Sequence, residues 1–218
     1  MKIGILGSGE VGRSLGAGFL RHGYEVAVGS RSPEKLDQWE TDAGNGARVG
    51  TFAEAASFGD LLVLAVKGTV AKDALALAGE ENLRGKPIID ATNPIADAAP
   101  ENGVLRFFTS LDESLMEQLQ EAYSEARFVK AFNSVGNALM VNPDFGGVRP
   151  TMFICGNDTA AKQEVGRIVD QFGFDVEDMG GVEAARAIEP LCILWCIPGF
   201  LRKDWTHAFK LLRGHQSS

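Results

Sequence analysis

The sequence predicts an α/β protein in which a doubly wound, mostly parallel sheet is followed by a small helical C-terminal part. Three observations lead to this fold class. Short β-branched runs alternate with helical patterns along the chain, which is typical of βαβ units. The run 60–66 is almost continuously apolar, as expected for a parallel strand covered on both faces. A chain of 218 residues is long enough for one sizeable domain and a small appendage.

The first half of the chain follows the βαβ pattern element by element. A helix over 10–21 follows the first strand, because Leu15 and Phe19 recur at helical spacing. A second helix begins at Ser32, a natural cap, and has Pro33 at its first helical position. The apolar runs predict strands at 2–6, 24–28, 48–51, 60–66, 87–92 and 127–132.

The second half begins with a long connection, 93–109, which is rich in Ala, Pro and Gly. Connections of this length in compact domains are usually functional or mobile. The pattern 110–113 predicts a capping box that opens the next helix. Two further strands and the helix between them are predicted at 151–155, 175–179 and 158–172. We therefore divide the chain into a domain over 1–179 and a small helical part over 180–218.

Charge and composition exclude several classes of function. The chain has 29 acidic and 21 basic residues, a net charge of −8, which argues against binding to nucleic acids or to anionic membranes. Its three cysteines, an odd number, at 155, 192 and 196, indicate reduced thiols. The apolar runs 3–6 and 191–197 are too short for a signal peptide and a membrane span, respectively. We expect a cytoplasmic protein.

A glycine-rich loop follows the first strand. The pattern G-x-G-x-x-G is common, but here it follows a strand and opens a helix, which is the context of a Rossmann dinucleotide site. The first glycine permits a tight turn, the second lets the backbone approach a pyrophosphate, and the third lets the helix pack closely on the sheet. A glycine-rich helix–sheet contact without a ligand is the alternative. The loop consists of Gly7, Ser8, Gly9, Glu10, Val11 and Gly12.

The end of the second strand distinguishes between dinucleotides. Sites for NAD or FAD usually place Asp or Glu there to bind the ribose hydroxyls. This chain has Ser30 and Arg31 at that place, and Lys35 lies one helical turn further on. A guanidinium fork and a hydroxyl suit a 2′-phosphate, and a lysine adds a point charge. The pattern predicts NADP rather than NAD; the alternative is a basic, solvated start of a helix.

Three more strand ends carry polar or turn residues after apolar runs. Ligands of such sheets bind beyond the carboxyl ends of the strands. We expect the first two ends to border the nicotinamide half of the cofactor and the third to face the substrate cavity. Ordinary turn chemistry and a strand-end cap are the alternatives at the second and third ends. The ends are Val66-Lys67-Gly68, Thr92-Asn93-Pro94 and Asn133-Ser134.

No constellation for hydrolysis or metal binding is evident, and no catalytic residue is assigned. His22 stands before Gly23 at a predicted helix end, where it is explained structurally. Cys192 and Cys196 lie four apart without further ligands nearby, so buried thiols are favoured over a metal site. Direct hydride transfer between two redox cofactors depends on orientation and on exclusion of water, and it needs no such acid or base.

Together with 130–134 and 152–158, these motifs resemble the NADPH-dependent coenzyme F420 oxidoreductase family. The resemblance covers nearly the whole chain, because 181–186 and 189–191 are similar to the C-terminal segment of that family. The wider group includes bacterial NADP-binding proteins and the cytosolic reductase domain of six-transmembrane metalloreductases. It implies hydride exchange between NADPH and a stacked second cofactor in a cleft under the C-terminal part.

The resemblance also implies a role for each motif. The residues from Ser8 to Val11 would hold the pyrophosphate, and the segments at Val66, Asn93 and Ala131 the nicotinamide side. Ser30, Arg31 and Lys35 would bind the 2′-phosphate. The chain departs from the family pattern at 67–68 and 133–136, where we expect contacts to the second cofactor.

Three functions are consistent with the sequence. The leading one is transfer of hydride from NADPH to a small-molecule redox acceptor, either a deazaflavin such as coenzyme F420 or a flavin. A second is reduction of a small carbonyl or imine, for which Lys67 is the only ready proton donor. A third is a sensor that binds NADP without catalysis. The apolar run 191–197 would pack on the sheet, form a homodimer interface, or do both.

We expect the Arg31→Ala variant to bind NADPH about ten- to a hundredfold more weakly, because a charge-assisted contact contributes roughly 1.5–3 kcal/mol. NADH has no 2′-phosphate, so its affinity should fall far less. Titration of the wild type and the variant with both cofactors measures this difference. Equal losses for the two cofactors would contradict the assignment to NADP.

Overall fold

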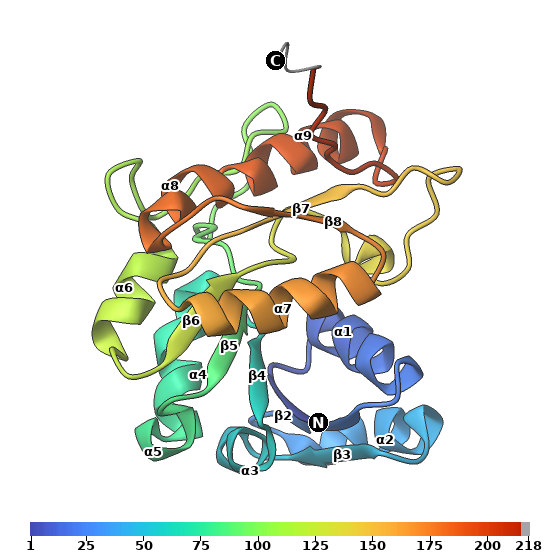
Figure 1. Cartoon of the computed structure of the whole chain (residues 1–218), viewed down its shortest axis with the longest axis vertical. Coiled ribbons are helices and arrows are strands. Elements are labelled where there is room, and N and C mark those ends of the chain that lie inside the picture. Colours follow the sequence, from blue (N-terminus) through green and yellow to red (C-terminus); the bar gives the residue numbers. More distant parts are fainter. Residues whose placement is uncertain (215–218) are drawn as a thin grey trace.

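Six parallel strands form the central sheet of the computed structural model, which describes residues 1–214 (Figure 1). The strands are β1 (Lys2–Leu6), β2 (Glu25–Gly29), β3 (Ala47–Gly50), β4 (Leu61–Leu64), β5 (Pro87–Asp90) and β6 (Arg127–Lys130). Their order is β3-β2-β1-β4-β5-β6. The strand order therefore reverses between β1 and β4, where ligands bind in sheets of this type. The predicted doubly wound α/β fold is confirmed.

Helices cover both faces of this sheet. Two clusters of buried side chains mark the two layers: one contains Leu15 and Phe19 of α1 with Val165 of α7, and the other contains Ala55 of α3 with Leu75 of α4. The helices up to the last strand are α1 (Glu10–Arg21), α2 (Asp37–Ala43), α3 (Phe52–Phe58), α4 (Ala71–Ala78), α5 (Glu80–Leu83), α6 (Leu115–Ala122) and α7 (Thr159–Gln171).

Three short helices, α3, α4 and α5, were not predicted. A local signal for α3 exists, because Thr51 and Glu54 form a capping box: Thr51 Oγ1 accepts a hydrogen bond from the Glu54 N–H, and Glu54 Oε2 accepts one from the Thr51 N–H. The helix predicted from Ser32 begins instead as a 3₁₀ helix, Pro33–Leu36, before α2. Ser32 makes no side-chain capping bond there.

The capping box predicted at 110–113 is wrong by one turn. The structure places it at Ser114 and Glu117, which exchange backbone-to-side-chain hydrogen bonds of 3.1 and 2.8 Å. Both segments fit the S-x-x-E pattern, so the pattern cannot choose between them. A tertiary contact selects the second pattern. The Glu189 carboxylate accepts hydrogen bonds from the backbone N–H groups of Leu115 and Met116 and so fixes the start of α6.

Two strands lie outside the six-stranded sheet. β7 (Thr151–Ile154) and β8 (Asp175–Asp178) form a small parallel sheet of their own. An isolated antiparallel bridge between Lys130 and Cys155 joins this pair to the end of β6. The helix α7 connects β7 to β8 and packs on β5 and β6. The two strands predicted near the C-terminus are confirmed.

The C-terminal part is helical only as far as Arg202. After the 3₁₀ turn Val182–Ala184, it contains α8 (Ala185–Ile188) and α9 (Leu191–Arg202), and the described residues beyond α9 have no regular secondary structure. Figure 1 shows α8 and α9 beside the small sheet, at the end of the molecule opposite β3. The prediction of helix throughout 180–218 is therefore wrong from residue 203 to 214; residues 215–218 lie outside the described part.

Tertiary contacts explain why the segment 203–214 is not helical. Lys203 has a φ of +58°, which ends α9. The backbone carbonyl of Phe209 then accepts a hydrogen bond of 2.8 Å from the Thr151 N–H on β7. The indole N–H of Trp195 also donates to the His207 carbonyl at 2.8 Å. These bonds hold the segment against β7 and α9 in place of a continued helix.

One side of α9 is covered and the other faces solvent. Cys192 and Trp195 are buried, whereas Leu194 and Leu201 are 55% and 56% exposed. Within the described residues, the helical stretch Val182–Arg202 is long and apolar enough, by length and composition, to cross a membrane. Of its 18 most apolar consecutive residues, 33% are buried inside the protein. The run around 191–197 thus packs on the protein with only part of its surface.

A partly exposed ion pair joins α6 to the C-terminal part. The Arg186 Nε donates to Glu117 Oε2 at 3.0 Å. The hydrogen bonds from Arg186 lower the pKa of Glu117 to about 2, and the capping bonds from Ser114 act in the same direction. The carboxylate of Glu117 therefore stabilises the fold only while it is ionised.

We expect the melting temperature of the wild type to fall more steeply below pH 5 than that of an Arg186→Gln variant. The pKa of Glu117 is lower in the folded protein than in the unfolded chain, where a glutamate titrates near about 4.3. Its stabilising contribution is complete above that value and is lost as the pH falls towards 2. Thermal unfolding of both proteins between pH 7 and pH 2.5 measures the difference, and parallel curves would contradict the role of the pair.

Candidate dinucleotide site

The glycine loop connects β1 to α1 in a conformation that requires glycine at two of its three glycine positions. Gly7 has a φ of +132°, and a Cβ there would lie 2.2 Å from the Ala65 carbonyl oxygen. A Cβ at Gly12 would lie 2.0 Å from the Gly7 carbonyl oxygen. A Cβ at Gly9 would meet nothing within 4 Å. Gly7 and Gly12 therefore serve close backbone packing, whereas Gly9 faces open space where a ligand can approach the backbone.

The end of β2 is tied to this loop by hydroxyl groups. Ser30 Oγ accepts a hydrogen bond from the Ser32 N–H and one from Ser8 Oγ, both at 3.1 Å. Ser30 is buried and Arg31 is exposed. No carboxylate in residues 1–214 forms an ion pair with Arg31, so its guanidinium is available to an anion. Lys35 is exposed on the following 3₁₀ turn.

Two cavities lie along the carboxyl ends of the strands and share Val66 and Lys67 among their lining residues. The first has a volume of about 620 Å³, and its wall includes Gly7, Ser8, Gly9, Ser30, Arg31 and Val70. The second has a volume of about 610 Å³, and its wall includes Val11, Gly68, Thr92, Asn93, Ile95 and Asp97. The two cavities are therefore adjacent at these residues, and we refer to them together as the groove.

Most of the residues singled out from the sequence line this groove, but seven do not. Glu10 and Lys35 are exposed outside its wall, and Gly12 packs against the loop. Pro94 and Ala131 are buried. Asn133 and Ser134, expected to face the substrate, are only 4% and 5% exposed.

Asn133 is linked to the groove through a hydrogen bond to Asn93. Its Nδ2 donates to Asn93 Oδ1 at 3.1 Å, and Asn93 lines the second cavity. Asn93 therefore lies at the wall, as expected, whereas Asn133 lies beneath it and does not face the cavity directly.

The titratable groups of the groove are few. Lys67 and Asp97 approach each other at 3.9 Å, and their side chains are 81% and 76% exposed. Asp73 and Arg31 line the first cavity. Within the described chain, neither cavity wall includes a histidine, cysteine or tyrosine. This arrangement suits binding and orientation of a ligand more than acid–base chemistry.

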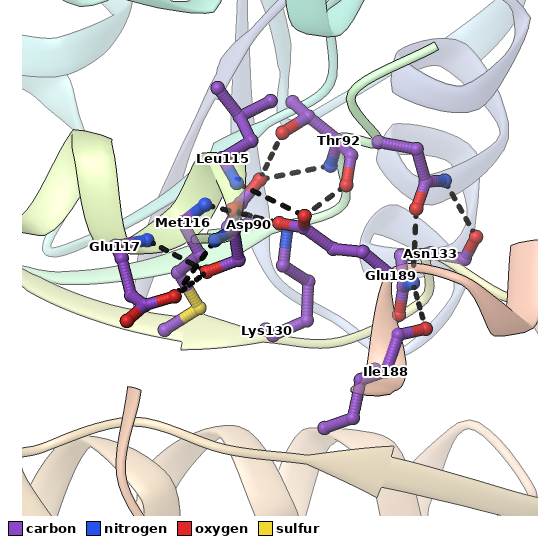
Figure 2. A network of polar contacts seen from close by, with 11 residues as sticks. Asp90, Thr92, Leu115, Met116, Glu117, Lys130, Asn133, Ile188 and Glu189 are labelled. Carbon is purple, nitrogen blue, oxygen red and sulfur yellow. Dashed lines mark hydrogen bonds and ion pairs between the residues drawn. The ribbon is translucent and has the colours of Figure 1, made fainter. Parts of the chain in front are cut away.

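A buried ion network lies behind the ends of β5 and β6 (Figure 2). The ammonium of Lys130 is 2.7 Å from Asp90 Oδ2 and 2.9 Å from Glu189 Oε1. It also donates to the Thr92 carbonyl at 3.0 Å. All three charged side chains are almost completely buried. A buried charge must be paired to be tolerated, and here each one is.

Backbone N–H groups and one hydroxyl complete this network. The Thr92 N–H and hydroxyl donate to Asp90 Oδ1 at 2.9 and 2.6 Å, and Glu189 binds two N–H groups at the start of α6. Burial lowers the pKa of Lys130, but the two carboxylates raise it further, so its pKa stands above the ordinary value. Lys130 is therefore charged at physiological pH.

The sequence analysis did not assign these three residues. Lys130 and Glu189 belong to segments that carry the family resemblance, but nothing in the local pattern pairs them. A usable signal was present, because Asp90 and Lys130 each end an apolar strand run. Charged residues in such runs are rarely buried without a partner.

Comparisons with known proteins agree with this geometry. The family described as NADP oxidoreductase, coenzyme F420-dependent, matches residues 2–94. The crystal structure of a candidate F420-dependent NADP reductase from Arthrobacter sp. FB24 has a TM-score of 0.90 and is 34% identical, covering 98% of this chain and 100% of that chain.

Two curated proteins are also similar over most of the chain. The F420-dependent NADP reductase of Methanocaldococcus jannaschii is 28% identical and covers 88% of this chain and 89% of that protein. The metalloreductase STEAP3 of Rattus norvegicus is 32% identical over 205 residues, which make up 92% of this chain. The chain spans only 39% of the length of that metalloreductase.

We expect Lys130→Met to destabilise the protein by about 3–5 kcal/mol, because it leaves two buried carboxylates without their cation. Urea unfolding at pH 7 measures the loss. A triple variant, Asp90→Asn with Lys130→Met and Glu189→Gln, removes all three charges and should regain much of the stability. A loss below about 1 kcal/mol for Lys130→Met would show that the pairing is unimportant for stability.

Proposed function

Because the chain belongs to the family of NADP oxidoreductases described as coenzyme F420-dependent, we propose that it transfers hydride between NADPH and a deazaflavin or flavin-like acceptor. The observation that carries the proposal is the groove formed by the two cavities that share Val66 and Lys67. One part lies at the phosphate loop, and the other lies beyond β4 and β5. A dinucleotide laid along the groove would have its phosphates at the loop and its nicotinamide at the second cavity.

Three features support NADPH as the dinucleotide. The loop offers open space at Gly9 and the free N–H groups of the first turn of α1. Arg31 has no ion-pair partner among the described residues and stands at the end of β2, where a 2′-phosphate would lie. Lys35, one turn further on, would add a second positive charge.

The second cavity supports a planar acceptor. Much of its wall consists of small or aliphatic side chains: Gly68, Ala91, Ile95, Ala96, Ala98 and Ala99. A wall of small apolar groups lets two flat rings stack closely and keeps water away from them. NADPH supplies the hydride, and the groove contributes orientation and dehydration. The scarcity of acid–base groups in the wall is consistent with such a transfer.

Lys67 favours a second candidate, reduction of a small carbonyl or imine. Its side chain lines both cavities, so its ammonium could protonate a substrate beside the nicotinamide. Its high exposure and its contact with Asp97 are more typical of a rim residue that contacts a ligand from outside. We therefore rank this candidate below exchange with a second planar cofactor.

We further propose a cytoplasmic homodimer. Leu194, Phe200 and Leu201 of α9 are 55%, 43% and 56% exposed, and a second copy of the chain would cover them. The net charge of −8 argues against nucleic acids and anionic membranes as alternative partners.

Anaerobic mixing of the protein with NADPH and coenzyme F420, then with FMN and with FAD, tests the function. We expect equimolar loss of the NADPH and deazaflavin absorbances, with one proton taken up for each hydride transferred. The Arg31→Ala variant serves as the matched control, because its KM for NADPH should rise without a change in acceptor specificity. Tight binding of NADPH that survives every acceptor would contradict the proposal and favour a sensor.

A further inference from the structure

Two asparagines at neighbouring strand ends form a reciprocal pair. Asn93 Nδ2 donates to the backbone carbonyl of Asn133 at 2.8 Å, and Asn133 Nδ2 donates to Asn93 Oδ1 at 3.1 Å. Asn133 Nδ2 makes a second bond of 3.0 Å to the backbone carbonyl of Ile188 in α8 (Figure 2). Three segments far apart in the sequence thus meet at this pair.

The bonds leave each amide only one orientation. A backbone carbonyl can only accept a hydrogen bond, so the carbonyl of Asn133 requires the NH₂ group of Asn93 to face it. The Oδ1 of Asn93 then faces Asn133, which must present its own NH₂ group. The Ile188 carbonyl also requires the NH₂ group of Asn133 to face it. Reversing either amide would set two acceptors against each other.

The backbone before Asn133 is held in an uncommon conformation. Phe132 has a φ of +62°, which is unusual for a bulky residue. Its N–H donates to the Met152 sulfur at 3.2 Å, and its buried ring packs against Phe172 and Phe174 at centroid distances of 5.8 and 6.1 Å. Strained backbone of this kind persists where its surroundings enforce it, and it is frequent at functional sites. Here it directly precedes the residue whose carbonyl and amide both bind Asn93.

We propose that Asn133 is a positioning residue that, together with the Ile188 carbonyl, fixes the amide of Asn93 for recognition of the nicotinamide carboxamide. After its bonds to Asn133, Asn93 keeps one N–H and one lone pair uncommitted among the described residues. Either of these can bind a primary carboxamide, which offers both N–H donors and a carbonyl acceptor. This inference rests on the proposed function, since it requires the nicotinamide of NADP to lie in the second cavity.

The same turn of the C-terminal part anchors the pair and the buried ion network. Ile188 binds Asn133, and the next residue, Glu189, binds Lys130. Lys130 and Asn133 lie three residues apart at the end of β6. The C-terminal part therefore orders the nicotinamide end of the groove through α8, and the phosphate loop lies outside these contacts.

Calorimetric titration with NADP⁺ and with adenosine 2′,5′-bisphosphate tests the inference without any acceptor. The bisphosphate carries the 2′-phosphate and lacks nicotinamide. We expect Asn133→Ala to weaken NADP⁺ binding about tenfold, the size of effect expected when hydrogen bonds that orient one ligand contact are lost. Binding of the bisphosphate should change less than twofold.

The matched control is Asn157→Ala. Asn157 Oδ1 accepts a hydrogen bond of 2.9 Å from the Val182 N–H, so this variant loosens the start of the C-terminal part without touching Asn93. It should leave both affinities within twofold of the wild type. Thermal unfolding of each variant checks that it remains folded at the titration temperature.

A double-mutant cycle shows whether Asn133 acts through Asn93. If Asn133 acts only through the amide of Asn93, that amide is already absent in an Asn93→Ala background. Asn133→Ala should then add less than a twofold further loss of NADP⁺ affinity. A further tenfold loss, equal losses for both ligands, or a selective loss in Asn157→Ala would overturn the inference. If the wild type bound neither ligand, the proposed function itself would be contradicted. If the wild type bound both, the results for the variants would test the inference alone.

Discussion

The contact of Lys130 with Asp90 and Glu189 is the interaction on which the rest of the structure depends. It buries one cation between two anions at the ends of β5 and β6, where an unpaired charge would be very costly. The surplus negative charge is met by the Thr92 hydroxyl and by the first N–H groups of α6. One network thereby joins two strand ends, the start of a helix and the C-terminal part.

This network explains why the second cavity, where we propose that the nicotinamide binds, has a defined wall. The segment after β5 is held at Thr92, and the next residue, Asn93, enters the wall of the second cavity. Glu189 and Ile188 bring α8 against the same strand ends. The phosphate end is organised differently, by close backbone packing at Gly7 and Gly12. The two ends of the groove therefore depend on different kinds of interaction.

Elements with a strong local signal were predicted well. The glycine loop, the parallel strands and the basic end of β2 all appear where the sequence places them, because each depends on residues that are close along the chain. The start of α6 shows the limit of this reasoning. Two S-x-x-E patterns compete four residues apart, and only Glu189, far away in the sequence, selects the second one.

The sequence by itself determined the fold class, the positions of the main strands along the chain and the glycine-rich loop, because periodicity and glycine spacing are local properties. Only the tertiary structure decided that Asn133 lies beneath Asn93 instead of facing the cavity, that the segment after Arg202 leaves the helix and hydrogen-bonds to β7, and that Lys130 has two acidic partners. Each of these outcomes depends on pairing between distant segments. The residues next to a charged or amide side chain in the sequence do not indicate which distant group it will bind in the folded protein.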